Sequence, residues 1–483
     1  MNVDTKRLST GVAGFDEILN GGLIPKQNTL LRGPPGAGKT TFGLHFLASG
    51  SATEETGLFI NLGEPDDYVR EAAEQFGLGT GSFDYLDLSP SDDQFRVDET
   101  YSLFPAAEVE QPGLVEEIRS TVEKVEPDRV FVDPISELRY LTTDDRQFRM
   151  QMLSFLDFLR AKDATVLLTS QAAETIPDDD LQFFTDAVIS LHHTPDTRTI
   201  RVSKFRGSSF RRGEHSYEID SSGVQVYPKL RQSPADTEFT ASLLSSGVRE
   251  LDEMLHGGLE NGTISILTGP TGVGKTTTGI QFLTEAALGG KHAIMYSFEE
   301  SPKTILHRAE AIDIPIHDMI DRGTLELREI QPLDLTVDEF AQSINTAVDE
   351  EDASIVMIDG IGGFKQNLRG LADDPTRDLI RIGRFLRNRS VTTLFANEVH
   401  EITGQFRATE ERTSNLADNV LFLRHVEFNG QIRKVIGVLK KRASDFESEL
   451  RELEITRHGL KVGDPLPQLR GILTGTPEWN DPE

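Results

Sequence analysis

Two segments of the 483-residue chain share the pattern G-x-x-x-x-G-K-T, whose residue types suit the binding of phosphate. Glycines let the backbone curl until successive N–H groups point at phosphate oxygens, and a helix that begins there adds the positive end of its dipole. Two matches in similar surroundings are hard to explain as chance glycine-rich turns. They predict two P-loops that bind ATP, formed by Gly33, Pro34, Pro35, Gly36, Ala37, Gly38, Lys39, Thr40 and Thr41, and by Gly269, Pro270, Thr271, Gly272, Val273, Gly274, Lys275, Thr276 and Thr277.

The lysine and threonine that end each pattern have separate expected roles. Lys39 and Lys275 would reach the β- and γ-phosphates, and Thr40 and Thr276 would place a hydroxyl directly on Mg²⁺. The two lysines are 236 positions apart (275 − 39). The same spacing recurs in other features, which indicates that the chain contains an internal duplication.

An apolar run that ends in aspartate follows each P-loop. Residues 130–133 read VFVD and residues 355–359 read IVMID. A buried strand of this kind holds a carboxylate at its carboxyl end, beside the P-loop, where it orients Mg²⁺ through water. The pattern alone is weak, but after a P-loop it predicts that Asp133 and Asp359 belong to the metal sites.

Glutamates follow the second expected strand of each half. Glu299 and Glu300 stand at a strand end that should face the phosphates. In the first half Glu64 matches Glu300, while Gly63 stands where Glu299 does. A carboxylate here can orient and deprotonate a water or a hydroxyl for in-line attack. The three glutamates are the catalytic candidates, and the alternative is a solvated acidic turn.

Two short basic segments stand out in an acidic chain. They contain Lys204 and Arg206 in the first half and Lys440 and Arg442 in the second. The matched spacing favours phosphate contacts made in trans, from a neighbouring subunit, which would require a ring. Solvated charge is the simpler alternative.

Two further candidates lie at the ends of later strand-like runs, 165–171 and 392–398. Gln171 and Asn397 are candidate sensors of the γ-phosphate, because polar groups at such strand ends face it in many P-loop enzymes. Ordinary strand-end polarity explains them equally well.

The order of apolar runs predicts an α/β fold. Strand-like runs such as 29–31 and 264–267, just before the P-loops, alternate with helical patterns such as 42–47. This alternation indicates, in each half, a mainly parallel sheet with helices on both faces. Residues 77–113 are expected to form a loop-rich surface excursion, to which we assign no function.

The duplication also sets the expected domain limits. Each copy opens with a similar tetrapeptide, S-T-G-V at 9–12 and S-S-G-V at 245–248. We expect an N-terminal domain over 1–230, a linker over 231–242, a C-terminal domain over 243–462 and a proline-containing tail over 463–483.

Composition excludes several classes of protein. The absence of cysteine excludes disulfides, thiolate metal sites and thiol catalysis, and the scattered histidines suggest no metal beyond Mg²⁺. No apolar run could span a membrane and the first seven residues lack an apolar signal region, so we expect a cytoplasmic protein without a membrane partner. The net charge of −30, from 79 acidic and 49 basic residues, opposes nucleic-acid binding and suits a halophilic source.

In combination, these motifs resemble those of the KaiC family of tandem RecA-like P-loop ATPases. They look most like the KaiC-like proteins of archaea, and the acidic composition favours haloarchaea. The resemblance runs from residue 9 to about residue 462. It implies two tandem RecA-like domains in stacked, usually hexameric rings with ATP at the subunit interfaces. It also implies slow ATPase activity and autophosphorylation of a Ser/Thr pair in the C-terminal ring.

The resemblance places Ser414 and Asn415 at the phosphorylated pair. Asn415 has no hydroxyl, so the candidate phosphosites are Ser414 and the nearby Thr413 and Thr409. Gly63 also departs from the paired glutamates of the family.

The leading hypothesis is a KaiC-like ring protein that binds Mg-ATP in both halves, hydrolyses it and is a candidate Ser/Thr autokinase in its second half. It would act in signalling as a homo-oligomer, expected to be a hexamer, with an unidentified protein partner. One alternative is a RecA-class DNA recombinase or helicase-like motor, against which the net charge argues. The other is a non-enzymatic scaffold assembled by nucleotide.

Overall fold

The chain divides into two units, Met1–Lys229 and Leu230–Glu483, each with its own sheet and hydrophobic core. The computed structural model describes residues 6–79, 81, 83–89, 112–141, 144–171, 178–231, 242–370, 375–399, 415–428, 430–472 and 478–479. None of the helices within these ranges combines the length and the apolar character needed to cross a bilayer.

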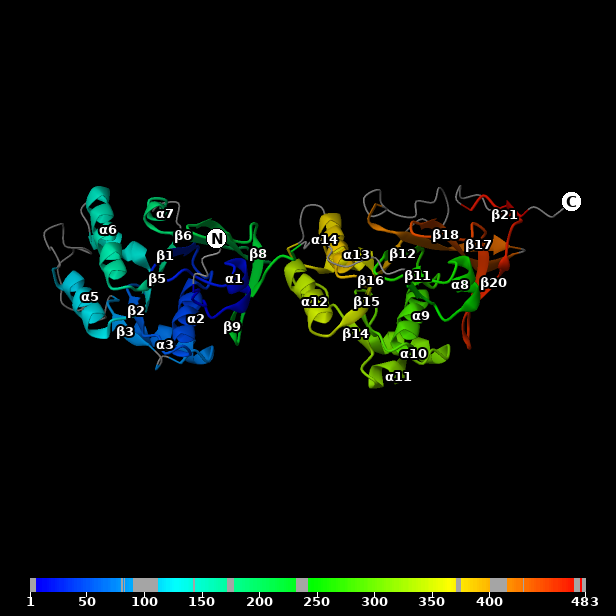
Figure 1. The fold of residues 1–483 in the computed structure, drawn as a ribbon, viewed down its shortest axis with the longest axis horizontal. Helices are drawn as coiled ribbons and strands as arrows, with labels where there is room; N and C mark the ends of the chain where they lie inside the picture. Colours follow the sequence, from blue (N-terminus) through cyan, green and yellow to red (C-terminus); the bar gives the residue numbers. More distant parts are fainter. Residues whose placement is uncertain are drawn as a thin grey trace. The chain divides into compact units, whose positions relative to one another are not determined.

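A nine-stranded sheet runs through the first unit (Figure 1). In spatial order its strands are β3 (Asp84–Asp87), β2 (Gly57–Asn61), β4 (Arg129–Asp133), β5 (Thr165–Gln171), β1 (Asn28–Gly33), β6 (Ala187–His193), β7 (Arg198–Phe205), β8 (His215–Asp220) and β9 (Gly223–Tyr227). The strands from β3 to β6 are parallel, and β7, β8 and β9 are antiparallel. β1, β2, β4 and β5 are buried along almost their whole length, which explains their continuous apolar sequences.

Helices cover both faces of this sheet. One face carries α1 (Ala13–Ile18), α2 (Lys39–Ser51) and α3 (Asp66–Gln75), and the other carries α5 (Pro112–Val125), the 3₁₀ helix η2 (Ile135–Leu141), α6 (Asp145–Ala161) and α7 (Leu181–Phe184). Figure 1 shows α1 and α2 on one side and α5 and α6 on the other. Alternate residues of β4 supply the two cores, since Phe131 packs with Phe46 of α2 while Val132 packs with Phe148 of α6.

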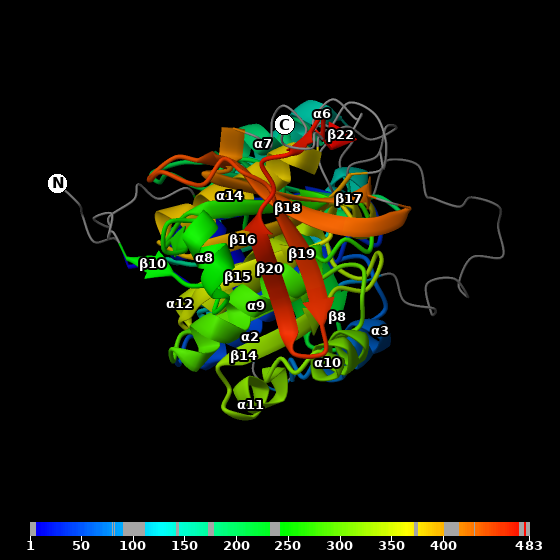
Figure 2. The same ribbon diagram turned by 90° about the vertical axis from the view of Figure 1, so that its right-hand side faces the viewer.

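The second unit repeats this topology. Its nine strands are, in spatial order, β14 (Leu325–Glu329), β13 (His292–Ser297), β15 (Ala353–Asp359), β16 (Thr392–Glu398), β12 (Ile264–Gly269), β17 (Asn419–Phe428), β18 (Gln431–Lys441), β19 (Arg451–Thr456) and β20 (Gly459–Pro465). The antiparallel strands β18, β19 and β20 form one end of this sheet, and Figure 2 shows β19 and β20 facing the viewer. Two small antiparallel pairs join β10 (Leu243–Leu244) to β11 (Leu259–Glu260), and β21 (Leu469–Arg470) to β22 (Glu478–Trp479).

The helices of the second unit are also divided between the two faces. One core contains α8 (Arg249–Met254), α9 (Lys275–Leu288), α10 (Pro302–Ala311) and α11 (Ile316–Asp321), and the other contains α12 (Val337–Asp349), α13 (Ile361–Asn367) and α14 (Pro375–Asn388). Local signals fix several of their ends. Ser301 caps α10, and Thr336 with Glu339 forms a capping box at the start of α12.

The predicted fold class is confirmed, because each unit is a mainly parallel α/β sheet with helices on both faces. The stretch 77–113, expected to be loop-rich, contains the edge strand β3, and residues 90–111 lie outside the described ranges. Within the segment expected to be a tail, Leu466 and Ile472 pack against Phe422 of β17. Most of the expected linker, 232–241, is not described.

Candidate functional site

The two P-loops lie at the carboxyl ends of β1 and β12, where each strand leads into α2 or α9. Gly38 and Gly274 cap these helices with φ angles of 80° and 116°. A Cβ on Gly38 would lie 2.4 Å from the side chain of Ile219. The left-handed backbone and this close approach both favour glycine. For this reason the P-loop can be recognised from the sequence.

Lys39 and Lys275 fold back over their own loops. The Nζ of Lys39 donates hydrogen bonds to the carbonyl oxygens of Gly33 and Pro34, both at 3.0 Å. The Nζ of Lys275 donates to that of Pro270 at 2.9 Å. Burial lowers the pKa of both ammonium groups, while nearby carboxylates act in the opposite direction. Each lysine is therefore held inside its loop, among carbonyl oxygens that phosphate oxygens could replace.

A threonine and an aspartate meet beside each P-loop. The hydroxyl of Thr40 donates to the Oδ2 of Asp133 at 2.5 Å. The hydroxyl of Thr276 donates to the Oδ2 of Asp359 at 2.9 Å. Burial raises the pKa of both carboxyls, that of Asp359 to about 6. Hydroxyl and carboxylate oxygens are ligands that Mg²⁺ prefers, so these two donor sets fit the expected ion.

The turn after the second strand has the same form in both halves. The side-chain amide of Asn61 donates to the carbonyl oxygen of Glu64 at 2.6 Å. In the second half the hydroxyl of Ser297 donates to that of Glu300 at 2.7 Å. Both turns follow a strand that pairs with the aspartate-bearing strand, β4 or β15. Glu64 is thus the positional equivalent of Glu300.

The structure gives Glu299 and Glu300 different partners. Glu300 forms an ion pair with Arg308 of α10, with 2.8 Å between Oε1 and Nη1. Glu299 lies close enough to Lys275 for each to affect the pKa of the other. Burial raises the pKa of Glu299, and neighbouring glutamates raise it further. A raised pKa beside the P-loop suits a general base.

Glu64 has the comparable surroundings in the first half. Burial raises its pKa, the charge of Asp133 raises it further, and Lys39 lowers it. Glu64 therefore matches Glu300 by position in the chain but Glu299 by its charged neighbours. Sequence spacing alone does not reveal this difference.

One carboxylate of the second site, at the end of β16, was not predicted from the sequence motifs. Glu398 pairs with Gly269, the first residue of the second P-loop. Its charge acts to raise the pKa of Lys275 and of Glu299. The second site therefore contains a third acidic side chain in addition to Asp359 and Glu299.

The two candidate sensors are not equivalent to each other. Gln171 pairs with Gly33 as Glu398 pairs with Gly269, so Glu398 is its counterpart. The amide of Asn397 is turned to β12, where it donates to Thr268. Strand-end polarity directed the prediction to Asn397 and not to Glu398, the next residue along the strand. A sensor role for Gln171 or Asn397 stays a prediction.

The basic segments are hydrogen-bonded within their own chain. Lys204 donates to the carbonyl oxygen of Gln182, and Lys440 donates to that of Ala417, both at 2.7 Å. Arg206 and Arg442 each lie 3.6 Å from an aspartate, Asp186 and Asp418 respectively.

The basic segments also lie at the opposite end of the sheet from the P-loops. Strand pairing connects Thr29 through β6 to Phe205, which is flanked by Lys204 and Arg206. The P-loop begins four residues further along β1, at Gly33, which corresponds to roughly 13 Å of strand. The second half has the same register, from β12 through β17 to Lys441. Own-chain contact with the nucleotide is not favoured by this arrangement.

The candidate phosphosites Ser414, Thr413 and Thr409 lie outside the described residues, which resume at Asn415.

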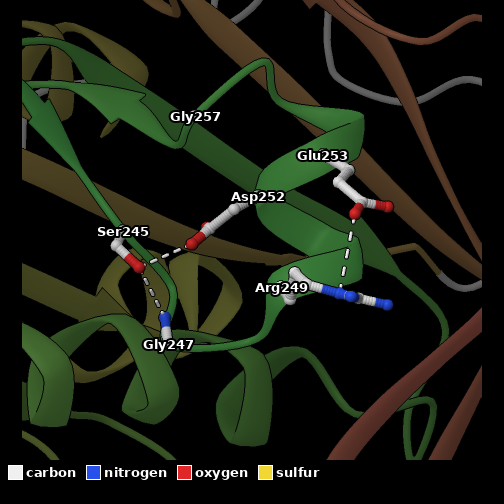
Figure 3. A pocket seen from close by; sticks show the side chains of 6 residues that line it. All are labelled: Ser245, Gly247, Arg249, Asp252, Glu253 and Gly257. Carbon is white, nitrogen blue, oxygen red and sulfur yellow. Dashed lines mark hydrogen bonds and ion pairs between the residues drawn. The ribbon is translucent and has the colours of Figure 1, made fainter.

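The tetrapeptide that opens the second copy lies at a surface pocket and forms hydrogen bonds that recur in the first copy. Figure 3 shows its lining residues, Ser245, Gly247, Arg249, Asp252, Glu253 and Gly257. The carboxylate of Asp252 accepts from the hydroxyl of Ser245 at 2.5 Å, and that hydroxyl accepts from the N–H of Gly247 at 2.9 Å. In the first half Asp16 accepts from Ser9 at 2.6 Å. Because the same bonds recur, we assign the motif to the turn before α1 and α8.

Comparisons with known proteins agree with this geometry. A family model described as "ATPase: KaiC" matches the chain twice, over residues 8–231 and 244–466. The circadian clock oscillator protein KaiC of Prochlorococcus marinus is 28% identical over an alignment 497 positions long, gaps included, which covers 99% of this chain and 96% of that protein. KaiC of Thermostichus vulcanus is 27% identical, with 99% and 92% covered. The circadian clock protein KaiC3 of Synechocystis is 25% identical, with 98% and 95% covered.

Two family matches, one for each P-loop unit, account for most of the chain. The chain therefore belongs to the KaiC family of ATPases.

Proposed function

We propose that each half binds Mg-ATP at its P-loop and that the protein hydrolyses ATP. The observation that carries this proposal is the repeated set of a loop lysine, a threonine bonded to a strand-end aspartate, and a nearby glutamate. The sets occur at the same place in two sheets of the same topology.

The residues have distinct roles in this proposal. Lys39 and Lys275 bind the β- and γ-phosphates, while the paired threonine and aspartate hold Mg²⁺ and its water. The bound ion supplies positive charge to the phosphates. Glu64 and Glu299 accept the proton of the attacking water. Basic residues of the segments at 204–206 and 440–442 contact the γ-phosphate of a neighbouring subunit.

We further propose a hexameric ring and Ser/Thr autokinase activity in the second half, with Ser414, Thr413 or Thr409 as acceptor. The distance of the basic segments from their own P-loops supports contacts between subunits. The relatives named above are clock proteins, and we propose a signalling role with a protein partner for this chain. The activity requires ATP, which supports a cytoplasmic location, and the acidic surface supports a haloarchaeal source.

The nucleotide sites can be tested one at a time. Lys39→Ala and Lys275→Ala should each weaken one site by about 10- to 100-fold, because each removes a charge-assisted contact to phosphate. Binding of a fluorescent ATP analogue with Mg²⁺ at molar KCl measures both sites. Lys26→Ala is the control, since Lys26 is exposed and pairs only with Asp163 among the described residues.

The double variant Lys39→Ala/Lys275→Ala should lose both binding and hydrolysis. Unchanged binding by that folded variant would contradict the proposal. The autokinase part has its own readout, which is isotopic labelling from ATP followed by phosphosite mapping. Absence of label from residues 409–414 would remove the kinase activity and leave ATP binding intact.

A further inference from the structure

In each half, the residue that follows the strand-end aspartate lies against the turn after the second strand, which carries the candidate glutamates. In the first half this residue is Pro134, and a Cβ added to Gly63 would lie 2.7 Å from its Cδ and 3.4 Å from its Cγ. Real Cβ atoms do not approach so closely, and the proline ring has no rotamer that would move aside. Pro134 therefore excludes any side chain from position 63.

The second half has the reverse arrangement. Gly360 follows Asp359, and a Cβ on Gly360 would lie 2.7 Å from Oε1, 2.8 Å from Cγ and 2.9 Å from Cδ of Glu299. The side chain of Glu299 thus occupies the space that a larger residue at 360 would need. In the first half the glycine, Gly63, lies in the turn and the larger residue follows the aspartate. In the second half the larger residue, Glu299, lies in the turn and the glycine follows the aspartate.

One backbone hydrogen bond beside the contact is the same in both halves, but the backbone at the residue after the aspartate differs, because Gly360 has a φ of 95° that a proline cannot adopt. The N–H of Leu62 donates to the carbonyl oxygen of Asp133 at 2.8 Å, and that of Phe298 donates to Asp359 at 3.1 Å. The two strand ends are therefore equivalent as far as the aspartate, and they diverge at the residue that follows it.

The second glutamate position differs as well. Arg308 holds Glu300 in an ion pair at 2.8 Å. The position equivalent to Arg308 in the first half is Ala72 of α3, 236 residues earlier (308 − 236). Ala72 offers no charge, so Glu64 has no such anchor from α3.

We infer that the residue following the strand-end aspartate decides which glutamate serves each site. Pro134 excludes a glutamate at 63, and Glu64 takes over its place in the first half. Gly360 admits Glu299 in the second half, and Arg308 holds Glu300 aside. Pro134 and Arg308 are positioning residues, since neither acts on the reacting atoms.

This inference rests on the proposed hydrolysis of ATP. The selected carboxylate takes a proton from water. The water oxygen forms a bond to the γ-phosphorus as the bond from phosphorus to the bridging oxygen breaks, and ADP leaves. The first half has a glutamate at only one of the two positions, so Glu64 must bring its carboxylate to the attacking water from there.

The test is a rescue experiment in full-length protein that carries Lys275→Ala, so that only the first site turns over. Glu64→Gln should lower steady-state hydrolysis by at least 100-fold, the usual contribution of a general base. Adding Gly63→Glu and Pro134→Gly together should recover at least tenfold of that loss. Adding Gly63→Glu alone, or Pro134→Gly alone, should recover none of it.

Rescue by Gly63→Glu alone would overturn the inference, because Pro134 would then exclude nothing. No rescue by the combined variant, while it still binds the ATP analogue with Mg²⁺, would overturn it too. If the combined variant does not fold, the second site decides. In a Lys39→Ala background, Glu299→Gln should reduce hydrolysis by at least tenfold more than Glu300→Gln, and the opposite order would overturn the inference.

These outcomes are distinct from failure of the proposed function. If hydrolysis is absent from the wild-type protein and from both parent variants, Lys275→Ala and Lys39→Ala, then the proposed activity itself is wrong. Parents that hydrolyse ATP with a different rescue pattern contradict only the inference about Pro134 and Gly360.

Discussion

The buried carboxyl of Asp359 lowers the stability of the nucleotide-free protein. Burial raises its pKa from 3.8 to about 6; the hydroxyl of Thr276 opposes the shift and the charges of Glu299 and Glu300 add to it. In the unfolded chain the same carboxyl ionises near its ordinary value. Since the folded pKa is the higher one, stability falls as the pH rises from about 4 to about 6, and the full cost remains above that range.

Asp359→Asn should therefore stabilise the nucleotide-free protein. The expected gain in free energy of unfolding is about 3 kcal/mol at pH 7.5 and roughly half of that at pH 5. Chemical denaturation at both pH values measures it, with the exposed Asp334→Asn as control. The same variant should lose the additional stability that Mg-ATP gives the parent protein. Equal effects of Asp359→Asn at the two pH values would contradict the assigned pKa.

At the scale of elements, a buried ion pair fixes the end of β18 that carries the second basic segment. Lys441 and Glu260 of β11 lie 3.0 Å apart with side chains 0% and 5% exposed. Lys441 also donates to the carbonyl oxygen of Leu255 at 2.6 Å. The positions 236 residues earlier are Phe205 and Ile24, which belong to the hydrophobic core of the first unit. The equivalent strand ends are therefore held by a buried ion pair in the second half and by apolar packing in the first.

Removing one partner of this ion pair should destabilise the fold more than replacing both partners with apolar residues. Glu260→Ala leaves the ammonium of Lys441 buried without its partner and should cost about 3–5 kcal/mol of unfolding free energy. Glu260→Ile with Lys441→Phe copies the first half and should recover most of the loss. Chemical denaturation measures both, and Glu454→Ala, which breaks the exposed pair with Lys461, is the control. A double variant as unstable as Glu260→Ala would contradict this account.

The elements that the sequence predicted best are those with strong local signals. Residues 130–133 are apolar without alternation because β4 is buried on both faces, and the P-loop glycines are required by backbone conformation. The prediction of a loop-rich stretch at 77–113 missed β3, whose short sequence D-Y-L-D carries little strand signal. Among the residues that the structure describes, this strand pairs with β2 alone.

The features that the sequence did not reveal depend on contacts between distant segments. Glu398 is one strand-end residue among several until its pairing with Gly269 places it beside the P-loop. The exclusion of a side chain at Gly63 depends on Pro134, 71 positions away (134 − 63), and is visible only when both turns are seen together. Spacing of 236 identified equivalent positions, but it did not show that Glu64 and Glu300 have different partners.

At the scale of the whole molecule, charge and site placement together favour an assembly at high salt. A net charge of −30 gives strong repulsion between copies at low ionic strength, and screening at molar salt removes most of it. The basic segments are short local exceptions to this charge. Each lies at the end of a sheet that is opposite to its own P-loop, so a head-to-tail contact between copies would bring the two features together.

Mixing two inactive variants tests this arrangement directly. Both carry Glu64→Gln, so that only the second half turns over. One adds Lys440→Ala with Arg442→Ala and keeps its P-loop, and the other adds Lys275→Ala and keeps its basic segment. In rings assembled from equal amounts, about one quarter of the interfaces would pair an intact P-loop with an intact basic segment. Hydrolysis by the mixture at molar KCl should therefore reach about one quarter of the Glu64→Gln parent, well above either variant alone.

The control mixture replaces the second variant with one that carries Lys275→Ala, Lys440→Ala and Arg442→Ala together. It offers neither feature and should restore nothing. Equal activity in the two mixtures, or a first mixture no more active than its components, would show that the basic segments do not serve a neighbour's nucleotide. In that case the role of Lys440 and Arg442 would lie in their own chain, where their contacts include those to Ala417 and Asp418.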